Sequence, residues 1–209
     1  MRYRTLLILM AAILLPLSAY GSAMTFTVDL LTSNEVPPTN STGSGTAIVT
    51  LDPAAQTLQV DVTYINLTSP TTAAHIHCCL NSPFATGVNV GVATTTPSFP
   101  GFPTGTSGNY VSPSFDLTQA SSYNPAFITA EGGLAQAEAA LIAGIESGAT
   151  YLNVHTMTNP GGEIRGFVVP AAGVGTLSAP EPGSLALLGS GLLGLFLVWR
   201  KRPSCGRSL

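Results

Sequence analysis

All three histidines of the chain lie in two short segments in which apolar and polar residues alternate. The segments are Ala74-His75-Ile76-His77-Cys78-Cys79 and Tyr151-Leu152-Asn153-Val154-His155-Thr156. Residues i and i+2 of a strand share a face, so His75 and His77 project together, and His155 projects to the polar side of its own segment. We expect the three imidazoles on the side of the sheet away from the core, where they converge if the two strands are neighbours.

Three imidazoles on one face are typical of a metal site. Neutral imidazole is the commonest protein ligand for zinc and copper, and three such ligands with one open position make a workable centre. In one interpretation, therefore, His75, His77 and His155 are metal ligands. In the alternative interpretation the same rings hydrogen-bond to carbonyls at the sheet edge, or to one another, and fix the strand ends.

Two adjacent cysteines follow the first histidine pair. Residues joined by a trans peptide bond hold their Cα atoms about 3.8 Å apart, below the separation of about 4.4 Å at which disulfides usually begin. We therefore expect a bridge between Cys78 and Cys79 to be strained and easily reduced. The other interpretations are free thiols, a bond to a second molecule, and ligation of a soft metal beside His77.

The segment after His155 predicts a hairpin. Asn159-Pro160-Gly161-Gly162 suits a type II turn, because proline presets its φ angle and the glycine after it accepts a positive φ. The strand that follows carries Glu163 and Arg165 on one face. We expect Arg165 to form an ion pair with Glu163 or another nearby acid, and recognition of a carboxylate or sulfate by Arg165 is the alternative.

The basic residues are concentrated at the two ends of the chain. Only 8% of the 209 residues are charged, against roughly 25% in an ordinary soluble domain. Between residues 5 and 199 the only lysine or arginine is Arg165, and residues 24–179 carry nine acidic residues, hence a net charge of −8 with neutral histidines. Such a body cannot neutralise a row of phosphates, so we exclude nucleic acid as a partner.

Short alternating segments joined by Gly, Pro, Ser and Thr turns predict an all-β fold, an antiparallel sandwich or Greek-key barrel. The expected strands are Thr25–Leu31, Thr46–Leu51, Gln56–Ile65, Ala73–Cys78, Gly87–Thr94, Asn109–Asp116, Tyr151–Thr156 and Glu163–Val169. Leu134–Ile145 has apolar residues at helical spacing, which predicts one helix covering the sheet. Pro97–Gly108 is rich in proline and glycine and is expected to be a loop.

The N-terminal segment is typical of a secretory signal peptide. Arg2 and Arg4 precede an apolar run, Leu6–Leu17, and small residues follow this run. We assign residues 1–23 to this signal helix. A buried first helix or a retained anchor is the alternative, but the run is shorter than the roughly 20 residues of a membrane span.

The C-terminal segment has three parts, Pro180-Glu181-Pro182, the uncharged run Gly183–Trp199, and Arg200-Lys201-Arg202. This order resembles the PEP-CTERM sorting signal of exported Gram-negative proteins and spans residues 180–203. The run would form a transmembrane helix about 25 Å long, and the basic residues would hold residues 204–209 in the cytoplasm. The resemblance implies cleavage near the motif by an exosortase, a membrane protease. A plain single-span anchor is the alternative.

Three motifs in the body resemble the CHRD domain, the module first named from chordin. They are Asn34-Glu35-Val36-Pro37-Pro38, Ala74-His75-Ile76-His77, and Tyr151-Leu152-Asn153-Val154-His155-Thr156 continuing through Pro160-Gly161-Gly162-Glu163-Ile164-Arg165-Gly166. The resemblance implies an immunoglobulin-like β-sandwich over residues 24–170, followed by a linker of small residues, 171–179. It implies no reaction, because in chordin the module belongs to a secreted growth-factor antagonist.

The function expected from these features is that of an exported, non-enzymatic protein of the cell surface or extracellular matrix. The chain has no nucleophile elbow, phosphate loop or cofactor fingerprint, so we expect neither catalysis nor a cofactor. The expected partners are the export machinery, an exosortase-type protease, the membrane through the C-terminal helix, and an extracellular polysaccharide or surface protein as ligand. The alternative function is binding of copper or zinc, with or without redox chemistry, by the histidine cluster.

Overall fold

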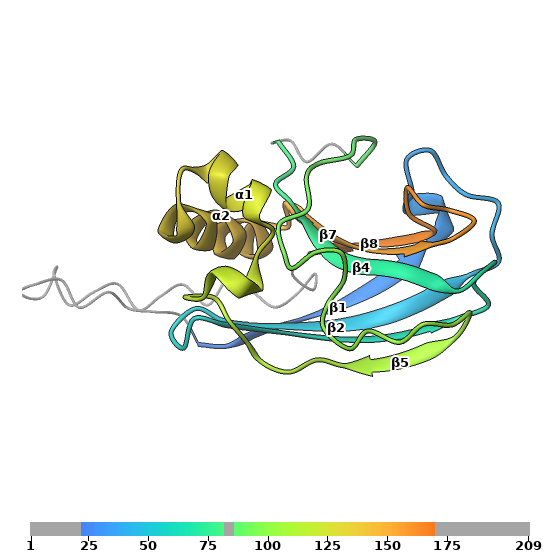
Figure 1. Cartoon of the computed structure of the whole chain (residues 1–209), viewed down its shortest axis with the longest axis horizontal. Helices are drawn as coiled ribbons and strands as arrows, with labels where there is room; N and C mark the ends of the chain where they lie inside the picture. The colour runs from blue at the N-terminus through green and yellow to red at the C-terminus, as the bar shows by residue number, and fades with distance from the viewer. Residues whose placement is uncertain (1–21, 82–85, 170–209) are drawn as a thin grey trace, which may run out of the picture.

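The computed structural model describes residues 22–81 and 86–169. Figure 1 shows a curled sheet with helices at one end. The strands are β1 (Met24–Leu31), β2 (Ser44–Asp52), β3 (Thr57–Ile65), β4 (Thr71–Cys78), β5 (Gly108–Val111), β6 (Phe115–Asp116), β7 (Thr150–Thr156) and β8 (Ile164–Val168). The α-helices are α1 (Pro125–Glu131) and α2 (Leu134–Ser147), and two short 3₁₀ turns are η1 (Thr32–Asn34) and η2 (Ala120–Ser122).

The strands form one antiparallel sheet in the order β4-β7-β8-β1-β2-β3-β5, with β6 also paired to β3. The ladder between β1 and β8 consists of a single residue pair, Leu31 and Arg165. At this narrow junction the sheet folds over, so that β4, β7 and β8 lie above the layer of β1, β2 and β5 (Figure 1). The expected mostly-β, antiparallel fold is confirmed, and its strands form one continuous sheet in the described residues.

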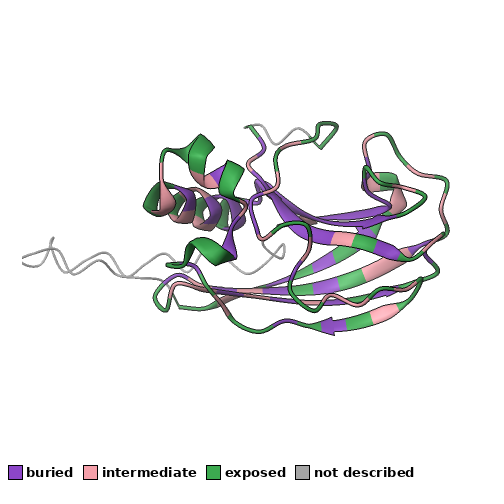
Figure 2. Cartoon of the chain, in the orientation of Figure 1, coloured by how far each residue is buried: buried purple, intermediate pink, exposed green. Residues whose placement is uncertain are grey.

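The hydrophobic core lies between the two layers. Val28, Val49 and Val60 come from the lower layer, and Ile76 and Val154 from the upper one, and all five are buried. Along β1, β2 and β3 buried residues alternate with exposed or partly exposed ones. In contrast, all of β7 and nearly all of β8 are buried on both faces (Figure 2). The upper layer is therefore covered on its outer face as well.

Two helices, rather than the single one expected, cover the end of the sheet. α2 contains the whole predicted segment, and its Leu141 and Ile145 are buried in the core. α1 was not predicted, because its seven residues are too few to show a helical period. The residues at its start are nevertheless typical of a helix N-terminus. The Asn124 side chain accepts a hydrogen bond from the Ala126 amide, and proline follows Asn124.

Two of the expected strands are wrong in detail. Gly87–Thr94 is not a strand: it follows the edge of β4 through one isolated bridge, His77 to Val92, and a few backbone bonds, such as Cys78 N–H to Gly91 O (3.1 Å). Asn109–Asp116 is divided into β5 and β6. Between them the Ser112 hydroxyl, instead of a backbone carbonyl, accepts the hydrogen bond from the Val60 amide (2.8 Å), and Pro113 has no N–H to donate.

The expected helices at the two ends of the chain lie largely or wholly outside the described residues. The predicted signal peptide, residues 1–23, overlaps the described part only at residues 22 and 23, and the linker and sorting segment lie beyond residue 169. Among residues 22–81 and 86–169, no helix has the length and hydrophobicity needed to cross a membrane.

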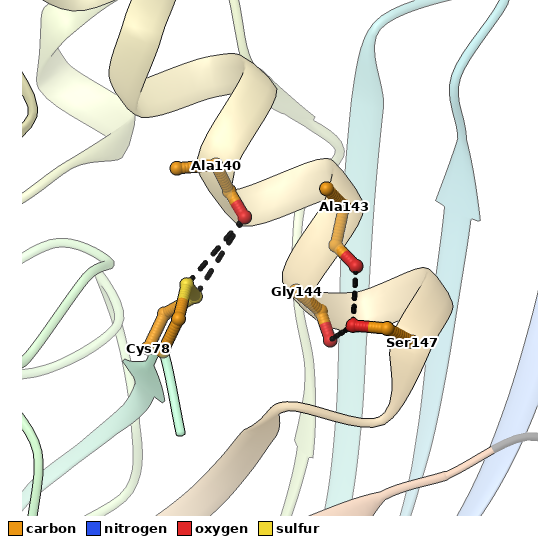
Figure 3. The surroundings of a disulfide bond; sticks show 6 residues. Cys78, Ala140, Ala143, Gly144 and Ser147 are labelled. Atoms are coloured by element: carbon orange, nitrogen blue, oxygen red, sulfur yellow. Dashed lines mark hydrogen bonds between the residues drawn. A yellow bond between two sulfur atoms is a disulfide. The ribbon is translucent and has the colours of Figure 1, made fainter. Parts of the chain in front are cut away.

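The adjacent cysteines are joined in a vicinal disulfide. Both sulfur atoms face α2, where they lie 3.7 and 3.5 Å from the Ala140 carbonyl oxygen (Figure 3). Cys78 belongs to the hydrophobic core, on the side of β4 opposite His77. The structure therefore shows an internal bridge, and not a free thiol pair, a bond to a second molecule or sulfur ligands beside His77.

The disulfide packs against α2 at Gly144, where a larger residue would collide with the sulfur atoms. A Cβ atom at Gly144 would lie 2.5 Å from the Cys78 sulfur and 3.0 Å from the Cys79 sulfur. We expect Gly144→Val to lower the free energy of unfolding by about 1–3 kcal/mol through overpacking, measured by urea denaturation. Gly161→Val is the matched control, because no atom of the described residues lies within 4 Å of a Cβ there. Equal stability of the two variants would contradict this packing.

Candidate functional site

The polar residues singled out in the sequence meet on the outer face of β4, β7 and β8. The strand register places His75 opposite Asn153 and His77 opposite Tyr151, and Asn153 lies opposite Arg165 on the next strand. The sequence predicts that the histidines lie on this face, away from the core, but it does not predict that the face is buried. All of these side chains are buried, with exposures of at most 8%, because the loop around residues 88–97, the segment around Glu35 and the turn at Pro160 cover them.

The three histidines form one compact cluster. Their potential ligand atoms all lie within 4.8 Å of one another. The Nε2 atoms of His75 and His155 are 2.9 Å apart. His77 Nε2 is buried and has no hydrogen-bond partner among the residues that the structure describes. The structure thus brings together three residues that come from two neighbouring strands, as antiparallel pairing of β4 with β7 requires.

The Nδ1 atom of each histidine lies within hydrogen-bond distance of a backbone carbonyl oxygen. The Nδ1 atoms of His75, His77 and His155 lie 3.0, 2.7 and 3.0 Å from the carbonyl oxygens of Pro97, Val90 and Pro160. A carbonyl oxygen only accepts hydrogen bonds, so this network assigns the proton of each neutral ring to Nδ1. Every Nε2 atom therefore carries an unprotonated lone pair, and those of His75 and His155 face each other.

The surroundings keep the rings neutral. Burial is the main cause that lowers the pKa of His75 to about 4 and that of His77 to about 3, and His155 lies beside His75 and adds to its lowering. Burial also lowers the pKa of His155, against the opposing effect of its bond to Pro160 O. At neutral pH the cluster is a set of three unprotonated imidazoles, which is the form that metals bind.

The donor set fits a transition-metal ion. Metal–nitrogen bonds of about 2.0–2.1 Å at tetrahedral angles place ligand nitrogens about 3.3 Å apart. The observed spacings, 2.9 Å for one pair and no more than 4.8 Å within the cluster, lie around this value. Metal-bound histidines almost always donate their second N–H to a carbonyl, carboxylate or water. All three rings of the cluster already face such an acceptor.

Beside the cluster, Arg165 pairs with Glu35, which lies 130 residues earlier in the chain. Arg165 Nη2 lies 2.9 Å from Glu35 Oε2, and Arg165 Nε donates to the same oxygen at 3.1 Å. Burial raises the pKa of Glu35 to about 7, and the Arg165 guanidinium opposes this rise. The sequence left two possibilities for the partner of Arg165, Glu163 or another nearby acid. The structure shows that the partner is Glu35 and not Glu163.

Arg165 and Tyr151 also hold the loop that orients His77. Arg165 donates to the carbonyl of Val88 (3.3 Å) and to Asn89 Oδ1 (2.6 Å). The Tyr151 hydroxyl accepts from the Val90 amide at 3.1 Å. The Tyr151 ring stacks on His77, with centroids 4.5 Å apart, and the Arg165 guanidinium lies 4.1 Å from the centroid of the same ring. The carbonyl of Val90 is thereby fixed against His77 Nδ1.

Glu163 does not share a site with Arg165, although the sequence suggested a common face. It lies just before β8, and its carboxylate accepts hydrogen bonds from the Thr68 amide and hydroxyl, both at 2.7 Å, and from Asn159 Nδ2 at 3.0 Å. The hydroxyls of Ser41 and Thr156 complete its shell. The fully buried carboxylate therefore joins four segments of the chain and has no basic partner among the described residues.

The hairpin before Glu163 is present, but its turn differs from the expected type II. The Gly162 amide donates to Asn159 O at 3.1 Å, which closes the turn. The positive φ, 125°, falls on Gly162 and not on Gly161. A Cβ atom at Gly162 would lie 2.6 Å from Asn153 Oδ1 and 2.7 Å from Glu35 Oε1. Glycine is therefore required at position 162 and not at 161, because the backbone there lies close to these buried side chains. The sequence does not show this approach.

Comparison with known proteins identifies two parts of the chain. A family model described as CHRD domain matches residues 26–168, and one described as PEP-CTERM protein-sorting motif matches residues 178–202. No curated protein and no solved structure matches the chain significantly. The sorting motif marks an exported protein with a membrane-anchored precursor that exosortase-type machinery processes. The chain therefore belongs to the CHRD family and carries a PEP-CTERM sorting motif after its domain.

Proposed function

We propose that this exported, surface-sorted protein binds one copper or zinc ion through His75, His77 and His155. The observation that carries the proposal is the common orientation of the three rings. Each Nδ1 is held by a carbonyl oxygen, which leaves three unprotonated Nε2 atoms in a cluster whose potential ligand atoms lie within 4.8 Å of one another. Converging lone pairs repel each other unless a cation lies between them.

A purely structural role for the histidines explains these contacts less well. Two unprotonated Nε2 atoms 2.9 Å apart cannot hydrogen-bond to each other, because neither has a proton to donate. A proton shared between His75 and His155 would relieve the repulsion, but burial lowers the pKa of both rings and disfavours it. Neither arrangement satisfies the buried Nε2 of His77. A metal ion accepts all three lone pairs at once.

We infer a binding role and not catalysis for this centre. Its three rings are at most 8% exposed under the loop that contains Val90 and Pro97, so a substrate has little access to a bound ion. The two layers that pack face to face support the immunoglobulin-like sandwich that the family resemblance implies. In this proposal the sandwich carries the ion as part of a surface or matrix protein, after sorting through the C-terminal motif.

The test is metal analysis of the purified full-length protein after loading with copper or zinc and removal of unbound ions. We expect close to one ion per chain. His75→Ala, His77→Ala and His155→Gln should each weaken binding by at least tenfold, because two imidazoles bind an ion far less tightly than three. Thermal unfolding of each variant without metal shows whether it has folded.

Glu131→Gln is the control for adventitious binding, because Glu131 is an exposed acid at the end of α1. It should bind metal as the natural protein does. Binding of much less than one ion per chain by the natural protein would overturn the proposal. So would binding that the folded histidine variants retain in full.

A further inference from the structure

Resting on the proposed function, we infer that the histidine cluster selects copper in its +1 state over zinc and over copper in its +2 state. The inference follows from the charge of the cluster and its surroundings. Among the described residues, the group that can hold the ion contains three histidines and no aspartate, glutamate or cysteine. All three ligands are neutral, so a bound ion keeps its full charge.

The neighbours of the ligands do not compensate that charge either. The second nitrogen of each ring faces a neutral backbone carbonyl and not a carboxylate. The thiols that would otherwise supply negative charge are joined in the Cys78–Cys79 disulfide, which faces α2 on the other side of β4. A divalent ion would therefore lie in the protein interior with its charge unbalanced.

The ion pair nearest to the cluster, Glu35 with Arg165, carries no net charge. The Glu35 carboxylate is bound to Arg165, and the Arg165 guanidinium lies over the ring of Tyr151, which stacks on His77. Glu163 is ionised, but its carboxylate is bound to the hydroxyl of Thr156, which lies on the face of β7 opposite His155. Since the cost of moving an ion out of water grows with the square of its charge, burial at this site penalises a divalent ion about four times as much as a monovalent one.

The number of ligands points the same way. Zinc in proteins is almost always four-coordinate, so a three-histidine zinc site needs a water or another ligand in the fourth position. Here the rings lie under the loop around Val90 and Pro97 and are at most 8% exposed. Cu(I) is stable with three ligands alone. Three buried, neutral nitrogen donors therefore suit Cu(I) without a fourth ligand.

The test compares three ions on the purified full-length protein. Cu(I), kept reduced by ascorbate without oxygen, competes against bathocuproine disulfonate, and Zn(II) and Cu(II) compete against chelators of known affinity. We expect the dissociation constant for Cu(I) to be at least 100-fold lower than those for Zn(II) and Cu(II). X-ray absorption of the Cu(I) form should show about three nitrogen ligands at about 2.0 Å.

His155→Glu supplies the matched variant, because it replaces one neutral ligand by a carboxylate. It should reduce the preference for Cu(I) by at least tenfold while divalent ions still bind. Zn(II) or Cu(II) binding as tightly as Cu(I) to the natural protein would overturn this inference and leave the proposed function intact. Binding of none of the three ions would overturn the proposed function itself.

Discussion

Replacing Arg165 with methionine should lower the free energy of unfolding by about 3–5 kcal/mol, which is the usual cost of removing one partner of a buried ion pair. Both side chains are almost completely buried, at 0% and 2% exposure. Without Arg165, the Glu35 carboxylate would keep only one side-chain hydrogen bond within the described part of the chain, from Asn153 Nδ2 at 3.5 Å. Denaturant unfolding at pH 7 measures the loss.

The cost of Arg165→Met should shrink as the pH falls. The pKa of Glu35 is already raised by burial to about 7, and loss of the guanidinium that opposes this rise would raise it further. A protonated Glu35 needs no cation, so the variant should recover stability relative to the natural protein as the pH falls from about 9 to about 7, where only the variant takes up the proton, and the difference should change little below that. Unfolding measured at both pH values checks the sign.

A double variant shows whether the loss comes from the pair. Glu35→Gln combined with Arg165→Met removes both charges, and we expect it to be less destabilised than the sum of the two single changes. Arg165→Lys should recover only part of the stability, because lysine cannot reproduce the separate bonds to Glu35, Val88 and Asn89. Additive single changes would contradict the assignment of Arg165 and Glu35 as one energetic unit.

The second large effect concerns acid unfolding through Glu163. Burial of this carboxylate tends to raise its pKa, but the hydrogen bonds from Ser41, Thr156 and Thr68 together lower it to about 2, below the ordinary value of 4.5. A carboxyl group with a lowered pKa in the folded state stabilises the fold above pH 4.5. That stabilisation, about 3 kcal/mol, should be lost as the pH falls from 4.5 to about 2.

Glu163→Gln isolates this contribution. At pH 7 the variant should be less stable than the natural protein by about 3 kcal/mol, and the difference should become small near pH 2. Glu131→Gln makes the same chemical change at an exposed position and should leave the free energy of unfolding unchanged within about 0.5 kcal/mol. A difference between natural protein and Glu163→Gln that is independent of pH would contradict the assigned role.

Comparing the two proteins at each pH is necessary, because other buried groups titrate in the same range. His75 and His77 have lowered pKa values, so they favour unfolding as the pH falls below their ordinary value of 6.5. Glu35, whose pKa is raised, acts in the opposite direction between about pH 7 and 4.5. All three groups are the same in the natural protein and in Glu163→Gln, so their effects cancel in the difference.

Local patterns in the sequence were sufficient for most strands and for the face on which the histidines lie. Apolar and polar residues alternate along 57–65, 73–78 and 151–156, and that period alone places His75 and His77 on one face. The sequence did not predict α1, because a single N-cap is the main signal in its seven residues. It also did not predict the break in 109–116, which depends on one serine hydroxyl and one proline.

The sequence by itself determined the residue types, the apolar faces, the C-terminal sorting motif and the family, because each is a property of neighbouring residues. Tertiary structure alone decided what covers the outer face of β4, β7 and β8. The loop carbonyls of Pro97, Val90 and Pro160 set the protonated nitrogen of each histidine. Glu35, and not the adjacent Glu163, meets Arg165, because the narrow junction of β1 with β8 brings together residues 130 positions apart. Such contacts join residues that are far apart in the sequence, so the local pattern of apolar and polar residues does not predict them.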